Sequence, residues 1–581
     1  MGYTPHVLVI GGGVLGTGVA RDLAIRGLDV TLVTERGLGT GTTRGLGVIE
    51  SGARHSSDET LAKRLHSERQ KLGQIAGDCI ENTGGLMVSD SPAQGETLRK
   101  AADSASIPTD TIEGDDLRER EPGLSDDVGR AVSAPDAVVD PFTLTLATAS
   151  SAREYGATIR PHTTVTGIGV EEGTLDTVSL RHDPAPGAHP AAVQPVTDGG
   201  KPGVPGGEPD DADRTMPGEA AEEAKQFTAP STDEIDPDYV VNAVGGRADE
   251  VASLAGLELG RQTVVESTLL VDANPPDTVV TYRSSDGEDT VVMPRRGRTA
   301  IGTMRKTVTD DDGAAASITD VRELEDRASE AVPALQNEET LRADSALSLQ
   351  CSGGEAGHDH ELLDHGDRDG CWGMTTIVGG SLTTHRYVAE QVADDVCAKF
   401  GIRRECQTDE IPLPTVEPLG AASDITDERP VVCDSLPVTQ AELEAAFEAC
   451  ESPAIEEATL RLGTEFGSWG ESQCAYRVAS ALYPEYDESV VATVLQAFLD
   501  EHWETQRPVL RGETLESATR TYRSYVETMA LGDEAIHGED SQDGEAADPG
   551  IDLDSFADGR ETANRTRPLA CERPTGGELS R

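Results

Sequence analysis

A glycine frame near the start of the chain carries the clearest chemical signal. Four apolar residues, Val7 to Ile10, run directly into a G-x-G-x-x-G frame formed by Gly11, Gly13 and Gly16. In a strand–turn–helix unit the first glycine permits the turn, the second lets the backbone approach a pyrophosphate, and the third lets helix and strand pack closely. The helix start adds free N–H groups and the positive end of its dipole. The frame therefore predicts a dinucleotide site.

A second strand and an acid support this prediction. The run DVTLV at 29–33 follows at the distance of a βαβ unit and leads to Glu35, which we expect at the ribose of the nucleotide. A glycine-rich turn in an ordinary α/β sheet is the alternative. The order strand, turn, helix, strand and acid favours the dinucleotide.

The charge balance excludes some partners. The 581 residues include 48 Lys plus Arg and 106 Asp plus Glu, a net charge of -58, so nucleic acid and anionic membrane surfaces are poor partners. An acidic surface that steers cations is one interpretation. Acid spread along the whole chain is more typical of a halophilic protein, because a screening length of about 3 Å in molar salt makes such charge tolerable.

The nine cysteines are sparse and irregularly spaced, which favours a reducing compartment over a disulfide framework. No apolar run reaches the ~18 residues of a membrane-spanning helix. We expect a cytoplasmic protein that reaches the inner face of the membrane at most peripherally, through partner subunits.

The rest of the chain alternates between patterns. Short β-branched runs at 263–304 indicate an antiparallel sheet, and a strand–turn–helix pattern returns at 373–400. Helical periodicity fills 430–530. The stretch 183–236 and the tail from 531 are rich in Gly and acid with few bulky apolar residues, which predicts disorder.

Several motifs occur in one order: the glycine frame, GTT at 41–43, ESGARH at 50–55, DYVVNAVGG at 238–246 and TIVGGSLTTHRYVAE at 376–390. With these the chain resembles the FAD-dependent glycerol-3-phosphate dehydrogenases, most closely the A-type subunit of the anaerobic, quinone-linked form from haloarchaea. The resemblance extends over most of the chain outside the insertion. It implies hydride transfer from carbon 2 of glycerol 3-phosphate to FAD, with electrons passed through other subunits to quinone.

The resemblance also implies an architecture and a cofactor site. The fold would be α/β, with a Rossmann-like FAD-binding domain (1–80, 140–255 and 345–400), an antiparallel substrate domain (81–139 and 256–344) and a helical C-terminal domain (401–530). FAD would contact the glycine frame and Glu35, together with Thr42, Thr43, Gly245, Gly380, Leu382 and Thr383.

The chain departs from the family where the substrate would bind. Arg54 is kept, but Glu50 replaces a histidine, Ser348 stands at the position of a phosphate-binding arginine and Ser381 replaces a lysine. Each lost charged donor removes about 1.5 to 3 kcal/mol of phosphate binding. Other cations could compensate: Arg44, Arg295, Arg296 and Arg386.

The proton acceptor of the reaction would be Glu50, His55 or His385. Glu50 would repel an anionic substrate, so a catalytically silent or substrate-shifted paralogue, serving as one component of a complex, is an alternative. An amine or hydroxy-acid oxidase of the same architecture is a third.

Two further departures concern the nucleotide and a metal cluster. The family places the ribose-binding acid at the position of Thr34, one residue before Glu35. The C-terminal domain resembles an iron–sulfur domain with a C-x-C and a C-x4-C pair, of which Cys433 and Cys474 remain. Because a cluster needs about four thiolates, we expect no cluster, no other metal and a packing role for this domain, with Cys450 a buried apolar residue.

Overall fold

A computed structural model of the protein describes most of the chain before residue 529. The described residues are 3–89, 97, 99–100, 102–183, 231–284, 287–308, 315–351, 359–416, 438–450, 454–463, 474–482, 486 and 488–528. The predicted tail lies outside them, as does most of the predicted insertion.

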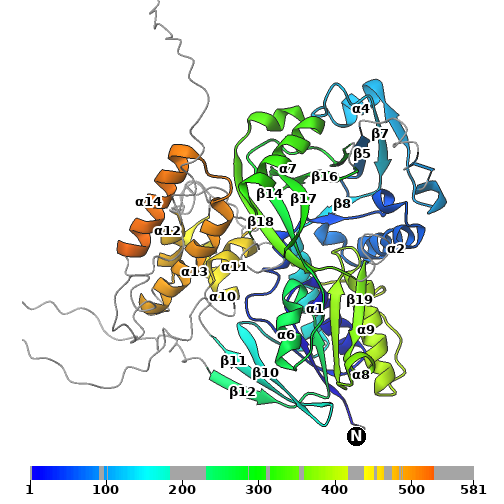
Figure 1. The fold of residues 1–581 in the computed structure, drawn as a ribbon, viewed down its shortest axis with the longest axis vertical. Helices are drawn as coiled ribbons and strands as arrows, with labels where there is room; N and C mark the ends of the chain where they lie inside the picture. Colours follow the sequence, from blue (N-terminus) through cyan, green and yellow to red (C-terminus); the bar gives the residue numbers. More distant parts are fainter. Residues whose placement is uncertain are drawn as a thin grey trace, which may run out of the picture. The chain divides into compact units, whose positions relative to one another are not determined.

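The nucleotide-type sheet has six strands in the order β19-β20-β13-β1-β2-β9 (Figure 1). All neighbouring strands pair in parallel except β19 with β20. The strands are β1 (His6–Ile10), β2 (Asp29–Val33), β9 (Thr158–Arg160), β13 (Tyr239–Asn242), β19 (His360–Asp364) and β20 (Met374–Gly379). Segments far apart in the sequence therefore form one sheet.

Alternation of side chains along β1 gives this sheet two buried faces. Val7 and Val9 pack in one apolar cluster with α1 (Val14–Ile25), α5 (Pro141–Glu154) and α9 (His385–Lys399). Leu8 and Ile10 pack in another, with α6 (Ala248–Leu254) and the strands β10 (Thr163–Glu171) and β11 (Thr174–His182). Strand β12 (Ser231–Ile235) extends this second layer, so the predicted disordered insertion contains a strand at its end.

The second large sheet has eight strands in the order β18-β14-β17-β16-β15-β5-β7-β6, and α7 (Ile318–Ala331) packs on it (Figure 1). All its pairs are antiparallel except β5 with β15. We call it the cap sheet; its strands are β5 (Gly85–Ser89), β6 (Thr111–Glu113), β7 (Arg130–Ala134), β14 (Thr263–Val271), β15 (Val279–Arg283), β16 (Asp289–Arg295), β17 (Arg298–Val308) and β18 (Thr340–Leu349). The last strand runs past the predicted limit of 344.

Smaller elements lie between the strands of these two sheets along the chain. They are β3 (Val48–Ile49), β4 (Ile80–Glu81), β8 (Ala137–Val139), α2 (Glu59–Ile75), α4 (Gly114–Arg120) and α8 (His365–Asp369). The segment after α9 returns to this region, because Leu413 N donates to Ile75 O at 2.7 Å. The chain after residue 401 thus first packs on α2 before it reaches the helical region.

The C-terminal region is helical, with its own buried apolar cluster. Its helices are α10 (Gln440–Ala449), α11 (Ile455–Arg461), α12 (Cys474–Ser480), α13 (Glu488–Gln506) and α14 (Gly512–Thr528). No described helix is long and apolar enough to cross a membrane. The predicted fold class, an α/β domain with an antiparallel second domain and a helical end, is confirmed.

Candidate functional site

The glycine frame forms a tight turn that only glycine can make. Gly11 has φ +119°, and a Cβ built on it would lie 2.5 Å from Ala243 O. A Cβ on Gly16 would lie 1.9 Å from Gly11 O. Gly13 is the N-cap of α1 and has no side chain to cap the helix. The bare backbone and the helix N-terminus fit a bound pyrophosphate.

A loop after β2, residues 36–44, crosses this glycine turn. Gly39 N donates to Gly12 O at 3.0 Å, and Val14 N donates to Thr42 Oγ1 at 3.1 Å. Thr42 therefore lies at the start of α1, where a phosphate would meet the helix. The hydroxyl of Thr43 instead donates to Thr40 O at 2.9 Å within the loop.

Glu35 and Thr34 lie on different sides of the end of β2. The Glu35 side chain is 46% exposed and forms an ion pair with Arg247. The Thr34 side chain is the one that faces the glycine turn, since a Cβ on Gly12 would lie 2.7 Å from Thr34 Cγ2. Thr34 is thus packed against the glycine turn, whereas the Glu35 carboxylate is held by Arg247.

Two further turns converge on the first. Gly245 has φ +69° and starts the short helix Gly245–Arg247 directly after β13, the strand beside β1. Gly380 has φ +90°, and a Cβ there would lie 3.2 Å from the Leu15 side chain of α1. In the same turn Leu382 packs against the cluster that contains Val14. These glycine segments are more than a hundred residues apart in the sequence, but they meet at one edge of the six-stranded sheet.

The predicted substrate residues form one cluster. Arg54 Nη2 forms an ion pair with Glu50 Oε1, and Arg54 Nε donates to His55 Nε2 at 3.1 Å. His55 Nε2 also lies 3.2 Å from Glu50 Oε2. The backbone of Glu50 is fixed by its N–H, which donates to Thr383 Oγ1 at 2.9 Å. This bond ties the cluster to the turn that contains Gly380.

Glu50 stays ionised in this setting. Its side chain is 16% exposed, and burial alone would raise its pKa. The charge of Arg54, together with the interaction and hydrogen bond of His55, outweighs burial and lowers the pKa of Glu50 to about 2. At neutral pH the ionised Glu50 carboxylate therefore neutralises the Arg54 charge.

Neighbouring groups from other elements complete the surroundings of the cluster. Ser51 N donates to Asp136 Oδ1 at 2.6 Å, and burial raises the pKa of Asp136. On the cap sheet, Glu266 forms an ion pair with Arg305 at 3.0 Å and accepts a 3.4 Å hydrogen bond from Ser348 Oγ. Single-sequence reasoning did not find Asp136 or Glu266, because isolated acids in a chain this acidic give no signal.

His385 does not join the cluster as a proton acceptor. It is buried in α9, its Nδ1 lies 2.7 Å from Leu382 O, and burial lowers its pKa to about 4. The second predicted serine replacement, Ser381, shares a 3.1 Å contact with Thr384 Oγ1 in the same turn.

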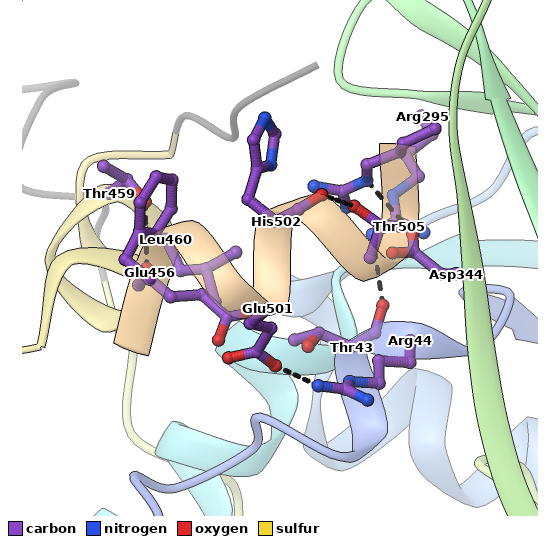
Figure 2. Close-up of a pocket in the computed structure, with 12 residues that line it drawn as sticks. Thr43, Arg44, Arg295, Asp344, Glu456, Thr459, Leu460, Glu501, His502 and Thr505 are labelled. Atoms are coloured by element: carbon purple, nitrogen blue, oxygen red, sulfur yellow. Dashed lines mark hydrogen bonds and ion pairs between the residues drawn. The ribbon is translucent and has the colours of Figure 1, made fainter. Parts of the chain in front are cut away.

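The arginines considered as replacements for the lost phosphate donors have protein partners. Arg386 Nε and Nη2 both donate to Glu68 at 2.7 Å, and both side chains are buried. Arg296 pairs with Asp140 at 2.7 Å. Arg44 and Arg295 line a cavity of about 50 Å³ beside α11 and α13, where Arg44 pairs with Glu501 and Arg295 donates to Thr43 O (Figure 2). Arg54 is thus the arginine that the structure places in the cluster with Glu50 and His55.

Within the described part of the chain, no group of three or more His, Cys, Asp or Glu side chains could hold a metal ion. Cys433 and the side chain of Cys474 lie outside the described residues. Cys450 is buried in the helical cluster, and burial raises its pKa.

The architecture and the glycine cradle define a class of flavoprotein. The model of the family of FAD-dependent oxidoreductases matches residues 6–195 and 213–394, and the chain belongs to this family. FAD is its cofactor, and the turn formed by Gly11, Gly13 and Gly16 fits the pyrophosphate of that cofactor.

Relatives narrow the class further. The chain is 33% identical to the A1 subunit of the anaerobic glycerol-3-phosphate dehydrogenase of Haloferax volcanii, over 96% of this chain and 95% of that protein. It is 29% identical to the A-type subunit of the anaerobic glycerol-3-phosphate dehydrogenase of Escherichia coli K12, over 89% and 95%. The FAD complex of glycerol-3-phosphate dehydrogenase from Bacillus halodurans has the same fold, with a TM-score of 0.51 at 18% identity over 92% and 97% of the two chains.

Proposed function

We propose that the protein oxidises glycerol 3-phosphate to dihydroxyacetone phosphate. The observation that carries the proposal is the cluster of Glu50, Arg54 and His55, tied through Thr383 to the turns that we assign to the FAD site. The names of the relatives support this substrate. Bound FAD supplies the acceptor for the hydride that leaves carbon 2.

The chain's own residues would orient the substrate and take its hydroxyl proton. His55 Nε2 accepts from Arg54 Nε, so the neutral ring carries its hydrogen on Nδ1, and Nε2 is the nitrogen that can take that proton. The Glu50 carboxylate then stabilises the imidazolium that forms. Arg54, on the other side of Glu50, would hold the polar end of the substrate.

A second candidate is a related substrate without the phosphate. The ion pair between Glu50 and Arg54 favours it, because the cation that would hold a phosphate already has a buried counter-charge. Replacement of the family's other cations by Ser348 and Ser381 points in the same direction.

We further propose that electrons leave the flavin through partner subunits to quinone at the inner face of the cell membrane. The relatives are named as subunits, which supports a complex. Copurification with a tagged chain from the native host, followed by quinone reduction, tests this part separately.

Anaerobic reduction tests the substrate. The holoprotein in molar salt is mixed with glycerol 3-phosphate or with glycerol, and loss of the visible flavin absorbance is followed. We expect glycerol 3-phosphate to bleach the flavin, and bleaching by glycerol alone supports the second candidate. Arg54→Met removes the cation of the cluster and should slow bleaching, while Lys63→Met, on the exposed face of α2, should not. A flavin that stays oxidised with both compounds contradicts both candidates.

A further inference from the structure

The helical region contacts the loop that crosses the glycine turn. On α13, Glu501 Oε1 accepts from Arg36 Nη1 at 2.9 Å and also forms an ion pair with Arg44. Figure 2 shows the Arg44 pair beside the cavity. Arg36 and Arg44 stand at the two ends of loop 36–44, so one carboxylate holds both ends of this loop.

Helix α11 contacts the same loop. A Cβ on Gly37 would lie 2.6 Å from Glu457 Oε2, so the Glu457 side chain lies directly against the loop backbone. Leu460 of the same helix belongs to the apolar cluster that contains Val7 and Val9 of β1. The helical region is thus joined to the nucleotide domain through both charge and apolar packing.

The loop transmits this contact to the cofactor side. Its Thr42 Oγ1 accepts from the first N–H of α1, and its Gly39 N–H donates to Gly12 O. The cap sheet holds the same loop, since Thr268 Oγ1 donates to Arg44 O at 3.0 Å. A shift of the loop therefore changes the N-terminus of α1, where the pyrophosphate binds.

Charges around Glu501 favour its ionised form. Burial opposes ionisation, but Arg44 and Arg36 lower the pKa of Glu501. For the neighbouring acid, Glu456, burial and the Glu501 charge raise the pKa. Glu501 is also the acid whose carboxylate contacts both arginines.

We propose that Glu501 is a positioning residue for FAD, which holds loop 36–44 against the glycine turn so that the helical region forms part of the cofactor site. This role goes beyond packing of the helical region. It is independent of which substrate is oxidised.

The test uses the full-length protein with Glu501→Gln, and Glu504→Gln on the exposed side of the same helix as the control. The dissociation constant of FAD is measured from the rise in flavin fluorescence when the holoprotein is diluted. We expect Glu501→Gln to raise this constant about tenfold, within the range of coupling between linked sites, and Glu504→Gln to leave it within about twofold of wild type. The side chains of Arg36 and Arg44 are 55% and 29% exposed, so water can solvate both after the substitution.

A double-mutant cycle separates positioning from general stability. Arg44→Gln should weaken FAD binding as Glu501→Gln does, and the double variant should lose no more than the weaker-binding single variant. Glu501→Asp keeps the charge and should retain most of the affinity for FAD. This variant provides the test if Glu501→Gln does not fold. An unchanged FAD constant in Glu501→Gln, or full additivity with Arg44→Gln, overturns the proposal.

Discussion

Removal of the Glu50 charge should turn the substrate cluster into a stronger anion site. Glu50 is ionised at working pH and paired with Arg54, and its side chain is 16% exposed. At an effective dielectric constant of about 20, two unit charges ~6 Å apart interact by about 3 kcal/mol. A phosphate bound by Arg54 at about that distance from Glu50 would therefore gain up to about 100-fold in affinity in Glu50→Gln.

The assay is a titration of the holoprotein with inorganic phosphate and with glycerol 3-phosphate, followed by the shift of the flavin absorbance spectrum. Glu50→Gln should bind both about 10- to 100-fold more tightly than wild type. The control Glu59→Gln, on the exposed start of α2, should not change either constant. The rate of flavin reduction should fall at the same time, because His55 loses the carboxylate that holds its Nε2.

Equal phosphate affinity in Glu50→Gln and wild type would refute the reasoning, since Arg54 would then not be neutralised by Glu50. Higher salt should reduce the difference only modestly, because both side chains of the pair are partly buried.

Three further predictions concern the cofactor and stability. Gly16→Ala should give a colourless protein, because the added Cβ would meet Gly11 O. The control Gly18→Ala should keep its flavin, since its Cβ would make an ordinary 3.4 Å contact with Ala389. The visible absorbance of the purified variants checks this prediction. Burial lowers the pKa of His162 from 6.5 to about 4, so the unfolded chain binds the proton more readily than the folded chain. The free energy of unfolding should therefore fall as pH drops from 6.5 to 4, by up to about 3 kcal/mol. Urea unfolding at several pH values should show a shallower slope for His162→Asn, which tolerates the positive φ of this position; an unchanged slope contradicts the assignment. Arg386→Gln leaves the buried Glu68 with only the partly exposed Lys71, at 3.2 Å, as a cation partner and should cost about 3 kcal/mol in urea unfolding. A loss under about 1 kcal/mol would show that the pair is dispensable.

The cofactor side of the molecule was predictable because backbone constraints leave marks in the sequence. Gly11 and Gly16 occupy positions where any Cβ meets backbone, and the unbroken apolar run of Val7, Leu8 and Val9 is typical of a strand buried on both faces. Such rules are local and survive divergence in the rest of the chain.

Contacts between side chains that are far apart in the sequence cannot be predicted in this way. The sequence does not show that Thr34, rather than Glu35, faces the glycine turn, because this depends on how β2 ends and on the Arg247 pair. The contacts of Glu501 with Arg36 and Arg44 likewise join residues more than 450 positions apart. Only the packed structure brings such charges together.

The parallel pairing of β5 with β15 bears on how the chain reaches its native state. Between these two strands the chain completes β9 and β13 of the other sheet. During synthesis β5 emerges long before β15. The edge of β5 that pairs with β15 therefore stays unpaired until β15 leaves the ribosome. Fragments that end before β15 are therefore expected to aggregate, whereas the complete chain closes this edge itself.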